Sequence, residues 1–195
     1  LSSAASDVYK RQFKEEHMAY LICTILVTVL VCLDQITKYI FLNPPYQLYE
    51  SVTFIKGLFN IHPCYNTGAA WSMLNNHPVL LQIVSVLGVT LLIYLLKDFR
   101  LKRRPFYSYG LVLALAGTVG NMIDRIFSKN GVADFIQFAF WTDYPTFNLA
   151  DSFLCIGVVM ICIHLVFFES KDPIKVLPEW MKRKKKETSE GNDDE

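Results

Sequence analysis

The feature that most constrains this chain is a set of four apolar stretches, each close to the length that crosses a membrane. They cover about residues 18–42, 78–96, 105–126 and 148–168. A helix needs about 20 apolar residues to span a hydrocarbon layer of ~30 Å. The hydrophobic content of 52% and the mean hydropathy of +0.28 agree with this pattern. The sequence therefore predicts an all-α membrane protein with four transmembrane helices.

Basic residues cluster at particular linkers and predict which side of the membrane each linker faces. The linker after the second stretch carries Lys97, Arg100, Lys102, Arg103 and Arg104, and a basic run covers residues 182–186. Short linkers rich in Lys and Arg stay on the cytoplasmic side, so we expect linkers 43–77 and 127–147 on the outer side and both chain ends in the cytoplasm. Because the charges follow this topology, nucleic-acid binding is not expected.

The outer linkers and the chain ends differ from the spans in composition. Residues 51–74 mix β-branched and aromatic residues with glycines at turn positions, which predicts a small β-sheet in the first outer linker. Residues 169–195 form a charged tail that we expect to be disordered. Residues 1–12 resemble a translated sequencing adapter, so we expect them to be non-native, the natural start to lie near Met18 and the membrane domain to cover 13–168.

Cysteine and histidine provide no sign of a disulfide framework or a metal centre. The five cysteines form no CxxC pair, and four of them lie inside apolar stretches, where a thiol packs as a small hydrophobe. The four histidines are scattered without an HExxH arrangement. We therefore expect neither a metal nor another cofactor.

Four aspartates from separate parts of the chain are expected at one depth. Helical rise places Asp34 about 24 Å from the start of the first span and Asp124 about 28 Å from the start of the third. Asp151 begins the fourth span and Asp134 precedes it in the second outer linker. A carboxylate at membrane depth costs roughly 3 kcal/mol on insertion scales, so such residues usually face a polar cavity and are functional.

Each of these polar residues also has a structural interpretation. Asp34 and Lys38 have the i, i+4 spacing of a helical ion pair, and Asp124 could form an interfacial pair with Arg125. Asn148 and Asp151 could cap the fourth helix. Gly117 and Gly120 share a helical face with Asn121 and Asp124, and small residues there favour close helix packing.

Five sequence blocks, in order, are similar to those of one membrane peptidase family. The blocks are "DQITK" (34–38), "YNTGAAWS" (65–72), "GTVGNMIDR" (117–125), "VADF" (132–135) and "FNLADS" (147–152). Over residues 18–168 the chain resembles the signal peptidase II family, also called lipoprotein or prolipoprotein signal peptidase.

The resemblance implies an aspartic endopeptidase that removes signal peptides from diacylglyceryl-modified prolipoproteins by cutting before the lipid-bearing cysteine. It places the catalytic pair at Asp134 and Asp151, which would share a proton and activate water. Supporting and substrate-binding positions would be Asp34, Lys38, Asn66, Gly68, Asn121, Asp124, Arg125 and Asn148. It also implies the inner membrane of a bacterium, with the active site at the outer face, and we expect a monomer.

Within that group, Asn121, Asn148 and Arg125 are expected to orient the carboxylates, and Asn66 to hold the substrate backbone. Asp34 and Lys38 are expected to tie the first span to the outer sheet. Two non-enzymatic functions compete with this prediction. A small proton-coupled transporter requires ionisable residues near the membrane midplane, and a membrane scaffold would tolerate loss of either dyad aspartate.

Overall fold

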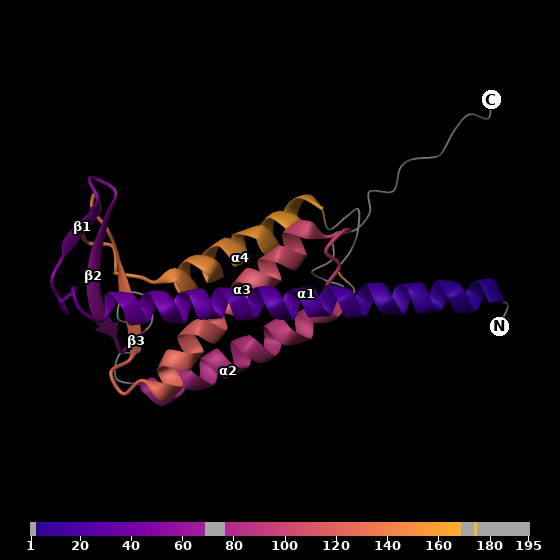
Figure 1. Ribbon diagram of the computed structural model, residues 1–195, viewed down its shortest axis with the longest axis horizontal. Helices are drawn as coiled ribbons and strands as arrows, with labels where there is room; N and C mark the ends of the chain where they lie inside the picture. The colour runs from indigo at the N-terminus through magenta and orange to yellow at the C-terminus, as the bar shows by residue number, and fades with distance from the viewer. Residues whose placement is uncertain (1–2, 69–76, 169–173, 175–195) are drawn as a thin grey trace, which may run out of the picture.

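The computed structural model describes residues 3–68, 77–168 and residue 174. It contains four long helices and one three-stranded antiparallel sheet (Figure 1). The helices are α1 (Ser3–Phe41), α2 (Pro78–Leu95), α3 (Pro105–Phe127) and α4 (Leu149–Phe167). All four are long and apolar enough to cross a membrane, which confirms the predicted fold class.

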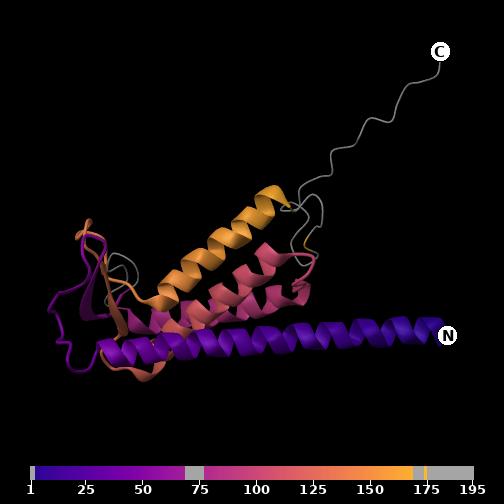
Figure 2. The same ribbon diagram turned by 45° about the horizontal axis from the view of Figure 1, so that its top comes forward.

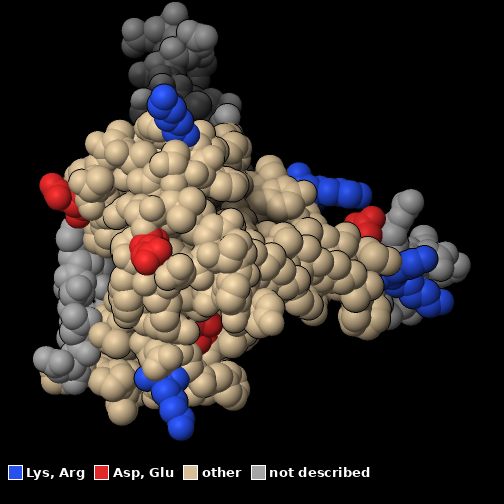
Figure 3. Space-filling model, turned by 60° about the vertical axis from the view of Figure 1, so that its left-hand side comes forward, with Lys and Arg blue, Asp and Glu red and all other residues tan. Residues whose placement is uncertain are grey.

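Helix α3 is the centre of the bundle and packs against each of the other three helices. The other helices expose large apolar side chains along their length, among them Ile25 on α1, Leu87 on α2 and Val159 on α4. A bundle in water would bury such side chains. Figure 3, which brings the sheet end forward, shows a mostly uncharged surface with a few Asp or Glu side chains on it and Lys and Arg toward its edges. The apolar side chains exposed on the helices suit a hydrocarbon environment.

The sheet lies at one end of the bundle, and its strands run across the helix axes (Figures 1 and 2). Strands β1 (Val52–Ile55) and β2 (Phe59–Asn66) form a hairpin in the first outer linker, where a small sheet was predicted. Gly57 supplies the positive φ of 78° that its turn requires. The third strand, β3 (Val132–Phe138), comes from the second outer linker and pairs with β2, so the sheet joins two linkers instead of one.

The predicted span boundaries agree with the helix ends within a few residues, except at the start of α1. The apolar part of α1 covers Phe13–Phe41, and the helix itself begins at Ser3. Helix α2 is followed by a short 3-10 helix, η2 (Leu96–Asp98). The non-native origin of residues 1–12 and the domain limits stay predictions. The expected disorder of the tail falls almost wholly on residues outside those that the structure describes.

Helices α3 and α4 approach each other closely because small residues line their contact. A Cβ atom added at Gly117 would clash with the carbonyl oxygen of Ala150, and one at Gly157 would lie 2.5 Å from the backbone nitrogen of Ala114. A Cβ at Gly120 would lie 2.7 Å from Oδ2 of Asp34. The glycine stripe therefore serves the close packing that the sequence predicted, and it also makes room for a buried carboxylate of α1.

Candidate active site

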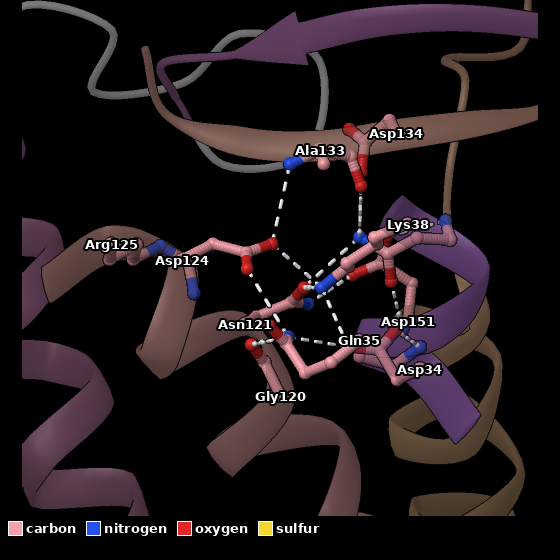
Figure 4. Close-up of polar contacts among 12 residues, drawn as sticks. Asp34, Gln35, Lys38, Gly120, Asn121, Asp124, Arg125, Ala133, Asp134 and Asp151 are labelled. Carbon is pink, nitrogen blue, oxygen red and sulfur yellow. Dashed lines mark hydrogen bonds and ion pairs between the residues drawn. The ribbon is translucent and has the colours of Figure 1, made fainter. Parts of the chain in front are cut away.

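The polar residues of the spans gather where the bundle meets the sheet (Figure 4). Asp34 and Lys38 come from the last turns of α1, and Asn121 and Asp124 from the last turns of α3. The remaining groups are contributed by the other elements at this end, namely Asn66 of β2, Asp134 of β3, and Asn148 and Asp151 at the start of α4. The convergence of the four aspartates at one end of the bundle agrees with the prediction.

Asp134 is held on β3 opposite Cys64 of β2, with 2% of its surface exposed. Its Oδ1 accepts a hydrogen bond from Nδ2 of Asn148 at 2.7 Å, and its Oδ2 accepts one from Nδ2 of Asn66 at 3.1 Å. Burial, and secondly the nearby charge of Asp151, raise the pKa of Asp134 to about 7, although both asparagines and Lys38 act in the opposite direction.

Asp151 lies in the first turn of α4 and forms a reciprocal capping box with Asn148. The backbone nitrogen of Asn148 donates to Oδ2 of Asp151 at 3.1 Å, and the backbone nitrogen of Asp151 donates to Oδ1 of Asn148 at 2.9 Å. Oδ1 of Asp151 accepts from Nδ2 of Asn121 at 2.7 Å. The capping interpretation is therefore correct, and the cap also orients the carboxylate.

Asn148 links the two carboxylates, since its side chain donates to Asp134 and its backbone donates to Asp151. The residue is fully buried. Its Nδ2 also lies 3.0 Å from Oδ1 of Asn121 and 3.2 Å from the carbonyl oxygen of Ala133. One amide thus fixes the strand that carries Asp134 relative to the helix that carries Asp151.

Lys38 lies at the centre of a second polar group, next to the pair formed by Asp134 and Asp151. Its Nζ lies 2.8 Å from Oδ2 of Asp34 and 2.8 Å from Oδ2 of Asp124, and it donates to Oδ1 of Asn121 at 3.1 Å. The i, i+4 ion pair of α1 is therefore present, but Asp124 pairs with Lys38, whereas Arg125 donates to Ser85.

The hydrogen bonds and ion pairs of Lys38 and Asp34 connect α1 directly to other helices and only indirectly to the sheet. Oδ1 of Asp34 accepts from the backbone nitrogen of Ala150 in α4, and Lys38 reaches α3. The link to β3 runs through Asp124, whose Oδ2 accepts from the backbone nitrogen of Ala133 at 3.3 Å. The expected tie to the sheet is thus indirect.

Gln35 is part of this cluster although sequence reasoning gave it no role. Its Nε2 lies 3.1 Å from Oδ2 of Asp34, 3.1 Å from the carbonyl oxygen of Gly120 and 3.2 Å from Oδ1 of Asp124. A polar amide inside an apolar helix, next to an aspartate, was the available signal. The contact with α3 depends on how the helices are rotated, which the sequence alone does not reveal.

Three further predicted residues lie at the edge of this network, namely Asn66, Gly68 and Arg125. The side chain of Asn66 contacts Asp134, and its Oδ1 accepts from the backbone nitrogen of Gly68 at 2.9 Å. Arg125 lines the same cavity as the two aspartates, and its backbone oxygen accepts from Gln82. Residues 69–72 of the second sequence block lie outside the described part of the chain.

A cavity of about 470 Å³ opens beside the two aspartates and extends between α2, α3 and α4. Its polar wall is formed by Asn66, Asn121, Arg125, Asp134 and Asp151, and other parts of its lining include Leu81, Val84, Gly88, Thr118 and Leu154. The size falls in the range of ligand-binding pockets. Within residues 3–68 and 77–168, no group of three or more His, Cys, Asp or Glu side chains is arranged to hold a metal ion.

The arrangement suits acid–base chemistry on a substrate that has both polar and apolar parts. With the pKa of Asp134 near 7 and the charge of Asp151 close by, the pair can hold one proton at neutral pH. A transporter would require its ionisable residues near the midplane, whereas this network lies at the ends of α1 and α3 and the start of α4, next to the sheet. The position of the network therefore differs from the one that a transporter requires.

Comparison with known proteins agrees with this geometry. Residues 26–167 match the family model described as Signal peptidase (SPase) II. The lipoprotein signal peptidase of Symbiobacterium thermophilum is 38% identical over 149 residues, covering 75% of this chain and 95% of that protein. The lipoprotein signal peptidase of Enterococcus faecalis is 38% identical over 146 residues, covering 74% of this chain and 88% of that protein.

Solved structures show the same similarity. A bacterial membrane enzyme determined by the in meso method at 2.3 Å resolution aligns with a TM-score of 0.69 and 32% sequence identity, covering 80% of this chain and 94% of that one. A second bacterial membrane enzyme, at 1.9 Å, aligns with a TM-score of 0.66 and 33% identity, covering 75% and 94%. The chain therefore belongs to the signal peptidase II family of membrane peptidases.

Proposed function

We propose that this protein removes the signal peptide from diacylglyceryl-modified prolipoproteins by cutting before the lipid-bearing cysteine. The observation that carries the proposal is the binding of two carboxylates by one buried residue, Asn148, at the wall of a cavity that continues between the helices. Family membership supports the substrate class. Asp134 and Asp151 are the proposed catalytic residues.

The proposed reaction uses a water molecule between the two carboxylates, which together hold one proton. The ionised carboxylate takes a proton from the water as its oxygen attacks the scissile carbonyl carbon. The protonated carboxylic acid gives its proton to the carbonyl oxygen. Collapse of the tetrahedral intermediate breaks the C–N bond, and a proton passes to the leaving amine. We do not assign the shared proton to one aspartate, since the pair titrates as a unit.

The asparagines keep the two carboxylates in place during this cycle. Asn66 and Asn148 donate to Asp134, and Asn121 donates to Asp151, so each carboxylate has a fixed rotamer before substrate arrives. Arg125 is proposed to bind a substrate carbonyl, because the residue lines the cavity beside the two aspartates and its buried Nε has no hydrogen-bond partner among the described residues.

The experiment is a cleavage assay with a purified diacylglyceryl-modified prolipoprotein in detergent. We expect Asp134→Asn and Asp151→Asn each to abolish cleavage while leaving the protein folded, because an amide cannot exchange the required proton. Thermal unfolding of each variant serves as the folding control. Cleavage retained by either variant contradicts the dyad, and binding of the prolipoprotein without cleavage by the unaltered protein would favour a scaffold.

A further inference from the structure

The cavity has two chemically different ends. Its polar end lies at the two aspartates, and its inner end is lined by Val84, Gly88, Thr118, Leu154 and Cys155. Along α2 the lining runs from Leu81 to Gly88, and seven residues of helix correspond to about 10 Å of depth. The cavity thus includes an apolar arm, defined by these five residues, that leads from the catalytic end along α2, α3 and α4.

Gly88 and Thr118 line the part of the apolar arm that lies deepest along α2 and α3 from the two aspartates. The hydroxyl of Thr118 donates to the carbonyl oxygen of Ala114 at 2.7 Å, so the polar part of that side chain is satisfied within its own helix. A Cβ atom added at Gly88 would meet Cγ2 of Thr118 at 3.5 Å, an ordinary contact. Gly88 therefore differs from Gly117, where an added Cβ would clash with backbone.

The absence of a side chain at Gly88 is thus not required for helix packing. It leaves space at the inner end of the apolar arm, and a larger side chain there would extend into the cavity that Gly88 lines. The size of the residue at such a position can therefore set the length of the apolar group that the arm accepts.

We propose that the apolar arm holds an acyl chain of the substrate and that Gly88 sets the chain length that fits. This inference rests on the proposed function. In that reaction the scissile bond adjoins the lipid-bearing cysteine, so an acyl chain must start near the dyad and continue into an apolar region. The apolar arm begins at the dyad and has this character.

The test compares two lipopeptides that share one peptide sequence and carry either dihexanoyl or dipalmitoyl glyceryl groups. We expect Gly88→Leu to lower the ratio of kcat/KM for the long-chain over the short-chain substrate about tenfold, the scale of a methylene-sized change in an apolar pocket. Cleavage of the short-chain substrate should change little. Gly88→Ala should act in the same direction and more weakly, because one methyl group fits beside Thr118.

A matched control is available on the same helix. Leu87 is 62% exposed on the outer surface of α2, so Leu87→Phe should leave the ratio unchanged. Thr118→Leu fills the arm from α3 and should change the ratio in the same way as Gly88→Leu. The second variant keeps the test valid if one of the two proteins fails to fold.

An unchanged ratio in both filled variants, or an equal loss on both substrates, overturns the proposal. The same change of ratio in Leu87→Phe also overturns it. If the unaltered protein cleaves neither lipopeptide, the proposed function itself is contradicted. Failure of the proposed function is therefore distinguishable from failure of the proposal about Gly88.

Discussion

At the scale of single residues, Asp134 is distinguished by burial on a strand next to a second acid. Its pKa is raised to about 7, from an ordinary value of 3.8. The folded chain therefore binds this proton more tightly than the unfolded chain does. The resulting contribution to stability is complete below about pH 4 and is lost as pH rises through about 7.

The same pKa predicts the pH dependence of cleavage. Above about pH 7 the pair loses its shared proton, so kcat/KM should fall with increasing pH. Asn66 donates to the charged form of Asp134 and lowers its pKa, so Asn66→Ala should move this fall upward by roughly one pH unit. The measurement is the pH profile of kcat/KM.

A control for the Asn66 variant lies next to the same sheet, directly before β1. Ser51 donates to Gln137, away from the two aspartates, and Ser51→Ala should leave the profile in place. A profile that moves downward in Asn66→Ala, or does not move, would contradict the assigned role of the hydrogen bond.

The group around Lys38 places two carboxylates and one ammonium in a buried site. Lys38→Met would leave Asp34 and Asp124 without their cation, and breaking a buried pair in this way typically costs about 3–5 kcal/mol. Asp124→Asn removes one negative charge, and the ion pair between Asp34 and Lys38 remains. We therefore expect a large fall in thermal stability for Lys38→Met, and impaired but measurable cleavage for Asp124→Asn.

Thermal unfolding and cleavage assays on the purified variants check both expectations. A loss of cleavage in Asp124→Asn as complete and specific as that of the dyad variants would show that Asp124 belongs to the chemistry itself. A stable Lys38→Met protein would contradict the expected cost of leaving the two carboxylates without their cation.

At the scale of elements, the contact of α3 with α4 positions the start of α4 and therefore Asp151. Gly117→Ala would place a methyl group against the carbonyl of Ala150, and overpacking of this kind costs about 1–3 kcal/mol. We expect a lower Tm for Gly117→Ala in detergent. Gly88→Ala is the matched control, because its methyl group meets only Thr118 at 3.5 Å. Equal Tm values for the two variants would argue against tight α3–α4 packing.

Strand β3 positions Asp134, as the α3–α4 contact positions Asp151. Its pairing with β2 sets Asp134 opposite Cys64 and brings Asn66 near the carboxylate. The pKa of Cys64 is raised to about 11, first by burial and then by the charge of Asp134, so this thiol stays protonated at neutral pH. The two outer linkers therefore act as one sheet that positions an acid above the bundle.

At the scale of the whole molecule, the site and the basic linker lie at opposite ends. The linker between α2 and α3 lies away from the sheet (Figure 1), and buried Arg104 pairs there with Asp98 at 3.3 Å. Lys97, Lys102 and Arg103 add further positive charge to this linker. Because basic linkers stay in the cytoplasm, we propose that the dyad faces the outer side of the membrane.

Labelling with a membrane-impermeant maleimide tests this orientation in a variant without the five native cysteines. Lys102→Cys and Asp143→Cys are a matched pair, since both positions are exposed in linkers at opposite ends. Asp143→Cys should react in intact cells, and Lys102→Cys only after lysis. The reverse pattern would place the dyad on the cytoplasmic side.

The sequence by itself determined the four spans, the presence of a small sheet in the first outer linker and the common depth of the four aspartates. These follow from local physics: hydrocarbon thickness fixes the length of an apolar helix, and helical rise fixes the depth of a residue along it. The cap of α4 could be predicted for the same reason, because Asn148 and Asp151 are three residues apart.

Tertiary structure alone decided which polar groups meet. Asp124 pairs with Lys38 instead of its neighbour Arg125, Gln35 joins α1 to α3, and β3 completes a sheet begun in another linker. The apolar arm at Gly88 also exists only between packed helices. Such contacts depend on the rotation of each helix and the register of each strand relative to distant neighbours, and local periodicity does not specify either one.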